Sequence, residues 1–138
     1  MNDPAVIQQM AVAKTLAVIG VSENPDKPSH YVSEYMQHHG TTVYPVNPAV
    51  ETVLGVKSYA SLTDLVTAGV RPAVVNVFRL PGAIPAIVDE MIALGLKDLW
   101  VQQGIVNLEA AAKAEAAGIR VVMGRCIMLE HRSLVGWQ

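Results

Sequence analysis

Cysteine is almost absent from this sequence of 138 residues, and aromatic residues and positive charge are scarce. The single cysteine, Cys126, excludes an intramolecular disulfide framework and any zinc site built from four cysteines. The formal net charge is -2, so the chain has no general basic surface for nucleic acid. Aromatic residues make up 5% of the chain, too few for a platform that stacks single-stranded bases.

The sequence also lacks the features of an exported or membrane-bound protein. Its first four residues, MNDP, carry no cationic start of a secretory signal. The longest stretch without Asp, Glu, Lys or Arg covers residues 35–50, and its histidines and prolines prevent it from spanning a bilayer. We therefore expect a cytoplasmic protein that does not bind membranes.

The chain does have enough apolar material for one folded domain. Hydrophobic residues make up 51% of it and charged residues 16%, a composition that excludes intrinsic disorder. A chain of this length buries roughly two thirds of its unfolded surface, so it needs no disulfide or metal to fold. We expect residues 1–138 to form a single domain.

Short runs rich in Val and Ile alternate with helical patterns along the chain. This alternation predicts an α/β fold, a Rossmann-like doubly wound parallel sheet of about five strands. Right-handed connections favour the order 3-2-1-4-5, with strands numbered along the chain. Asp3, Ser29, Ser61 and Asn107 are the predicted helix N-caps. The predicted strands cover residues 15–20, 41–46, 73–78, 99–102 and 119–123, and the helices 3–13, 29–39, 61–68, 82–94 and 107–118.

A ligand of such a sheet binds beyond the carboxyl ends of the strands. The loop after the first predicted strand contains Gly20, Ser22 and Lys27, and it leads into a helix at Ser29. These residues would form a diphosphate cradle, because a helix N-terminus with free N–H groups around Ser29 and His30 attracts anions. The alternative is an ordinary loop closed by a capping serine.

The same loop does not carry the dinucleotide fingerprint. G-x-G-x-x-G requires two more glycines after Gly20, where this chain has Ser22 and Pro25. The second predicted strand also ends without the acidic residue that binds the ribose of NAD. Both observations argue against an ordinary NAD(P)-binding domain.

Other unusual residues follow the remaining strands. Asn47 precedes a proline in the turn after the second strand, where it would border an adenosine or simply form a rigid turn. Arg79 follows the third strand, where it would reach a phosphate or stay solvated. Gln102, Gln103 and Gly104 end the fourth strand, where they would contact a polar ligand or a neighbouring backbone. Cys126 has cationic neighbours in the sequence that favour a thiolate, although a lone cysteine is more often a small buried hydrophobic residue.

Seven short motifs, taken in order, resemble the small CoA-binding proteins. That family is similar to the N-terminal CoA-binding domain of the succinyl-CoA synthetase alpha subunit. The resemblance covers roughly residues 15–132 of the chain. The motifs are AVIGVS (17–22), NP (24–25), KPS (27–29), PVNP (45–48), VFR (77–79), QQGI (102–105) and RCIMLEH (125–131).

The resemblance implies a domain that binds CoA or an acyl-CoA. By position it implies a phosphate site after the first strand and an adenosine border after the second. A groove for the pantetheine arm or the diphosphate follows the third and fourth strands, and the thiol end follows the fifth. The residues of the phosphate site are Gly20, Ser22, Lys27, Pro28 and Ser29, and those of the adenosine border are Pro45, Asn47 and Pro48. The residues of the groove are Phe78, Arg79, Gln103 and Gly104, and those of the thiol end are Arg125 and Cys126.

The chain departs from the family pattern at two places. Ala49 and Val50 replace a basic residue after the PVNP turn, which weakens the case for a salt-bridged 3′-phosphate. Gly124 replaces an aspartate that would orient Arg125 or Cys126. The larger synthetase also needs a second domain with a phosphorylated histidine and a beta subunit, so we expect no ligase chemistry and predict no catalytic residue.

Four hypotheses remain at this point. The first is a non-catalytic module that binds CoA or an acyl-CoA, with exposed apolar helix faces that would favour a homodimer. The second is a thiol or redox module that uses Cys126 and CoA. The third is an NAD(P)-binding domain, and the fourth is an interaction subunit that has lost its ligand.

Overall fold

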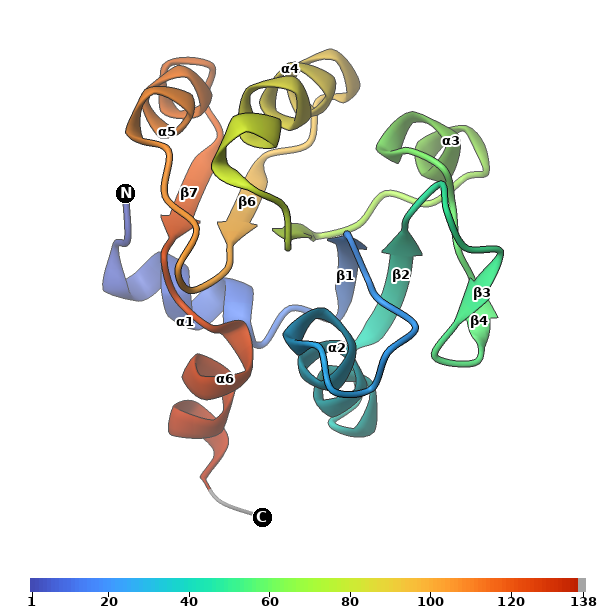
Figure 1. Cartoon of the computed structure of the whole chain (residues 1–138). Coiled ribbons are helices and arrows are strands. Elements are labelled where there is room, and N and C mark those ends of the chain that lie inside the picture. The colour runs from blue at the N-terminus through green and yellow to red at the C-terminus, as the bar shows by residue number, and fades with distance from the viewer. Residues whose placement is uncertain (137–138) are drawn as a thin grey trace.

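The central element of the computed structural model, which describes residues 1–136, is a sheet of five parallel strands in the order β2-β1-β5-β6-β7 (Figure 1). Their side chains are almost all buried, as expected for a parallel sheet covered on both faces. The predicted fold class is confirmed. The strands are β1 (Thr15–Ile19), β2 (Thr42–Val46), β5 (Val74–Val77), β6 (Asp98–Val101) and β7 (Arg120–Met123).

Numbered consecutively, the strands of this sheet follow the order 2-1-3-4-5, which differs from the predicted 3-2-1-4-5 in the place of the third strand. β5 pairs with β1, from Leu16 opposite Val74 to Ile19 opposite Val77. The chain leaves β1 through a helix on one face and leaves β2 through a helix on the other. A right-handed crossover on the opposite face must run in the opposite direction along the sheet, so β5 passes β1.

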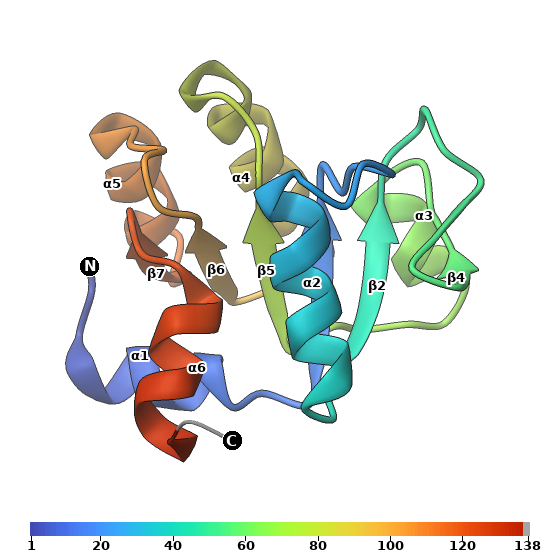
Figure 2. The same ribbon diagram turned by 60° about the horizontal axis from the view of Figure 1, so that its bottom comes forward.

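Helices cover both faces of the sheet in two layers (Figures 1 and 2). Alternate residues of each strand face the two layers, so Ala17 and Ile19 pack on one and Leu16 and Val18 on the other. One layer holds α3 (Leu62–Thr67), α4 (Ile84–Leu94) and α5 (Leu108–Ala116); the other holds α1 (Pro4–Ala11), α2 (Pro28–His38) and α6 (Ile127–Val135).

The helix starts show which predicted caps form. Asp3 Oδ1 accepts the N–H of Ala5 at 2.8 Å, and Ser61 and Asn107 likewise cap α3 and α5. Ser29 is not an N-cap, which corrects that prediction. Pro28 occupies the first turn of α2, because its ring fixes a helical φ, so the cap position moves back to Lys27.

Four elements of the structure have no separate counterpart in the sequence-based prediction. Strands β3 (Thr52–Val53) and β4 (Val56–Lys57) form a short antiparallel hairpin beside β2, and helix α6 follows β7. A short 3₁₀ helix, η1 (Pro81–Ala83), precedes α4. Among the described residues, no helix has the length and apolarity that crossing a membrane requires.

Candidate functional site

The carboxyl edge of the sheet contains a topological switch point between β1 and β5. These two strands are neighbours, yet the helices that follow them, α2 and α4, lie on opposite faces. The connections that follow these two strands therefore diverge and leave a crevice, which is the usual place for a ligand in open α/β sheets. Figure 2 shows β2 and β5 pointing to this edge, with α2 in front of the sheet.

A cavity of about 650 Å³ lies at this edge. Its volume falls within the roughly 300–1,000 Å³ that is usual for small-molecule sites. We call it the edge cavity. It is lined by Gly20, Ser22, Lys27, Pro28, Ser29, Tyr31, Val32, Phe78, Arg79, Leu80, Gln102, Gln103, Ile105, Cys126, Met128 and Leu129.

Gly20 allows the ends of β1 and β5 to approach each other closely. Its φ is +90°, and a Cβ at this position would lie 2.5 Å from the carbonyl oxygen of Phe78. The backbone N–H of Phe78 donates to Ile19 at 2.9 Å, and that of Gly20 donates to Val46 at 3.0 Å. Only glycine fits at this close approach, so the residue shapes the edge cavity that it lines.

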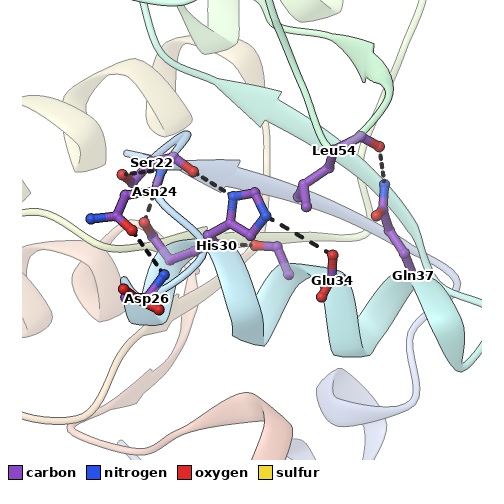
Figure 3. A network of polar contacts seen from close by, with 9 residues as sticks. Ser22, Asn24, Asp26, His30, Glu34, Gln37 and Leu54 are labelled. Atoms are coloured by element: carbon purple, nitrogen blue, oxygen red, sulfur yellow. Dashed lines mark hydrogen bonds and ion pairs between the residues drawn. The ribbon is translucent and has the colours of Figure 1, made fainter.

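The serines of the first loop hold it in place at the start of α2. Ser29 Oγ accepts the backbone N–H of Ser22 at 2.9 Å, and Ser22 Oγ accepts that of Asn24 at 3.0 Å (Figure 3). Asn24 Oδ1 in turn accepts the N–H of Asp26 at 2.9 Å. In all described contacts both serine hydroxyls act as acceptors, so their hydrogens can be donated to a ligand.

His30 supports this loop from the side of α2. Its Nδ1 lies 2.8 Å from the carbonyl oxygen of Ser22, and its Nε2 lies 4.0 Å from Glu34 (Figure 3). The backbone N–H of His30 donates to Lys27 at 2.9 Å, so it is not one of the free N–H groups that the sequence suggested. Anion attraction at this helix start comes from its dipole, Ser29 and the side chain of Lys27.

Electrostatically the edge cavity suits an anion. Lys27 and Arg79 are its two charged lining residues, and no carboxylate lines it within the described part of the chain. Both side chains are without an ion-pair partner among residues 1–136. A Cβ at Gly20 would lie 3.4 Å from Cδ of Arg79, so the stem of Arg79 runs beside the first loop.

The other end of the edge cavity is formed by the loop that leads into α6. Gln102 Oε1 accepts the buried backbone N–H of Ile127 at 3.0 Å, and Trp100 Nε1 donates to the carbonyl of Arg125 at 2.8 Å. These two bonds fix Cys126, a half-buried residue at the cap position of α6. The side chain of Arg125 pairs with Glu130 at 3.1 Å and does not line the cavity.

The predicted adenosine turn lies outside the edge cavity. Pro45, Asn47 and Pro48 are absent from its lining, as is Gly104. Asn47 Nδ2 donates to the carbonyl of Val21 at 2.9 Å, and its Oδ1 accepts the N–H of Ala49 at 2.9 Å. The amide therefore ties the turn after β2 to the first loop.

Nine of the residues that the family resemblance assigned to the site meet in the cavity, and seven further residues line it. Most of the missed residues are apolar, and their only signal in the sequence is closeness to a predicted residue. Gln102 adjoins Gln103, and the turn of α6 that follows Cys126 carries two of the others. The seven are Tyr31, Val32, Leu80, Gln102, Ile105, Met128 and Leu129.

Helix α6 is held against α2 by a partly buried polar contact. The hydroxyl of Tyr35 lies 2.8 Å from Nδ1 of His131, and the ring of His39 stacks on Tyr35. Burial lowers the pKa of His131, and the nearby His39 lowers it further. No group of His, Cys, Asp and Glu side chains in residues 1–136 is arranged to hold a metal ion.

Comparison with known proteins gives one consistent result. A family model described as a CoA binding domain matches residues 14–132. The uncharacterized protein YneT of Bacillus subtilis is 38% identical, over 86% of this chain and 86% of that protein. A solved structure described as a hypothetical protein from Pyrococcus horikoshii has a TM-score of 0.89 and 36% identity, and covers 99% of this chain and 94% of that one.

A larger enzyme also shows similarity. The ADP-forming acetate–CoA ligase of Methanocaldococcus jannaschii is 25% identical, over 93% of this chain. The alignment covers 19% of that enzyme, so the similarity concerns one part of it.

Proposed function

Because this chain belongs to the family of CoA binding domains, we propose that its edge cavity binds coenzyme A. The proposed role is binding, without ligase chemistry of its own. The observation that carries the proposal is that one cavity joins the start of α2 to the start of α6 along the carboxyl edge. A ligand that is anionic in the middle and extended toward a thiol matches that layout.

The order of the strands supports an order for the parts of the proposed ligand. The loops after β2, β1, β5, β6 and β7 succeed one another along the edge. We assign the adenosine to the turn at Asn47 and the diphosphate to Ser22, Lys27, Ser29 and Arg79. The pantetheine arm then passes Phe78 and Gln103 and brings its sulfur to Cys126.

The residues present suit this group chemically. Two unpaired cations and two serine hydroxyls face the diphosphate position, where no described carboxylate would repel it. Apolar walls accompany the arm. The first loop lacks the glycines that NAD-binding domains use, so the cavity favours CoA over NAD.

Isothermal titration with CoA, dephospho-CoA, NAD and ADP tests the proposal. We expect CoA to bind at micromolar concentration and NAD to bind at least tenfold more weakly. No heat with CoA up to millimolar concentration would refute the proposal and leave the chain as an interaction subunit without a ligand.

A matched set of variants locates the site. Replacing Lys27 or Arg79 by alanine removes a charge-assisted contact to phosphate, so each change is expected to weaken CoA binding by about tenfold. Lys14→Ala is the control, because Lys14 is exposed and directly precedes β1, at the opposite edge of the sheet. Equal losses in all three variants would contradict the assignment of the cations.

The place of Cys126 in the lining favours a second candidate function, reversible capture of CoA as a mixed disulfide. The thiolate of Cys126 would attack one sulfur of CoA disulfide, form the protein–CoA bond and release one CoA thiolate. Intact-protein mass spectrometry after incubation with CoA disulfide tests this. An adduct on the wild type that Cys126→Ser lacks supports it, and an unmodified wild type rejects it.

A further inference from the structure

We infer that the edge cavity is built for a thioester of CoA with an uncharged, apolar acyl group, which its α6 end holds. This inference rests on the proposed function. It concerns the part of the cavity beyond the sulfur, which free CoA would leave uncovered.

The cavity has two chemically different ends. Its charged and hydroxyl-bearing lining residues lie at the start of α2 and at the end of β5. The α6 end follows β6 and β7, up to three strand spacings from β1, or about 14 Å along the edge. The lining residues there are Gln102, Gln103, Ile105, Cys126, Met128 and Leu129, and none of them is charged.

Large apolar side chains remain uncovered on the wall of the cavity. Leu80 is 81% exposed and Leu129 is 47% exposed, and both line the cavity. Met128 and Ile105, which line it too, are partly exposed. Exposed apolar surface around a hollow typically marks a site where an apolar group binds.

Two polar groups at or beside the α6 end already have partners. Arg125 pairs with Glu130, and Oε1 of Gln102 accepts the N–H of Ile127. An acyl group with a terminal carboxylate would therefore find no free cation there among the described residues. A short aliphatic acyl group, by contrast, would cover Leu129 and the other exposed apolar surface of that end.

Titration with CoA, acetyl-CoA, butyryl-CoA and succinyl-CoA measures this preference. A fully buried methylene contributes about 0.8 kcal/mol, or about fourfold in Kd. In an open cavity we expect butyryl-CoA to bind at least fivefold tighter than free CoA and succinyl-CoA to bind no tighter than free CoA. Affinities equal within twofold, or tightest binding of succinyl-CoA, would overturn the inference alone; no binding of any of the four would overturn the proposed function with it.

Two leucines of α6 provide a matched pair of variants. Leu129 lines the cavity, whereas Leu134 is similarly exposed, at 41%, and does not. Leu129→Ser is expected to reduce the preference for butyryl-CoA over CoA, taken as the ratio of the two Kd values, to below twofold. Leu134→Ser is expected to keep the full preference. Thermal melting confirms that both variants fold, and an equal effect of the two, or no effect of either, would contradict the inference.

Discussion

At the scale of single residues, the edge cavity depends on side chains that shape the backbone as much as on those that would contact a ligand. Gly20 allows the ends of β1 and β5 to approach each other closely. Ser29 holds the first loop in place, because its hydroxyl oxygen accepts the N–H of Ser22. Asn47 ties that loop to the turn after β2. The sequence predicts a ligand contact for each of these residues, and the structure adds a positioning role to each.

Replacing Gly20 by alanine directly tests the close approach of the ends of β1 and β5. The change adds a clash with the carbonyl of Phe78 to an unfavourable positive φ, so we expect a loss of about 3 kcal/mol in the free energy of unfolding. Gly40→Ala is the control, because φ is +93° there but a Cβ would meet nothing within 4 Å. That variant should lose about 1 kcal/mol. Urea unfolding measures both, and equal losses would show that the close approach is unimportant.

Replacing Ser29 by alanine tests the loop. The partly buried N–H of Ser22 would lose its acceptor, at a cost of about 1–2 kcal/mol, and CoA binding should weaken several-fold because the loop is less ordered. Ser33 provides the control, since its hydroxyl is buried in the same helix and donates to the carbonyl of Ser29, outside the cavity lining. Ser33→Ala should lose stability without a matching loss of affinity, as measured by calorimetry. Equal losses of affinity in the two variants would rule out a specific role for Ser29.

At the scale of elements, α6 completes the cavity, yet sequence reasoning did not predict it. Its short pattern comes directly after the last strand, and its apolar side chains are divided between the core and the surface. Contacts far apart in the sequence hold it in place, namely Gln102 at its start and Tyr35 against His131. Such contacts leave no periodic signal, which explains the omission.

The contact between α6 and α2 predicts a sensitivity to acid. Because the pKa of His131 is lowered in the folded state, the unfolded chain binds a proton more readily. Its contribution to stability is therefore complete above the ordinary histidine pKa of about 6.5 and is lost as the pH falls below that value toward the folded-state pKa.

Replacing His131 by asparagine should reduce the loss of folding stability on acidification. Urea unfolding at about pH 7.5 and about pH 5.5 measures it, with the wild type losing more stability on acidification than the variant. His38→Asn, a change in an exposed residue at the end of α2, should behave as the wild type does. An identical acid dependence in wild type and His131→Asn would exclude His131 as its source.

At the scale of the whole molecule, alternating strands and helices allowed the fold class to be predicted, and local caps such as Asp3 and Asn107 were predicted correctly. The place of β5 was not, because handedness couples the direction of a crossover to the face that its helix covers, and the sequence does not show that α3 covers the face opposite to α2. The cavity's polar half could be predicted from loop residues. Its apolar half could not, since Leu80 and Leu129 look like ordinary surface leucines in the sequence.

The structure also offers an internal control for ligand mapping. A second hollow, of about 380 Å³, lies at the amino end of β7 and is lined by Gly118, Arg120 and Glu115 among others. It contains both charge signs and lies at the opposite edge of the sheet. A ligand of the edge cavity should leave it unchanged.

The central claim is that one CoA molecule spans the carboxyl edge from α2 to α6, and NMR titration of the labelled protein with CoA tests it most directly. The account predicts saturable shifts of the backbone amides of both Gly20 and Ser29 at one end and both Gln103 and Cys126 at the other, with one common Kd. The amides of Gly118 and Arg120 should not move. Shifts confined to one end of the cavity, or centred on the second hollow, would contradict the account.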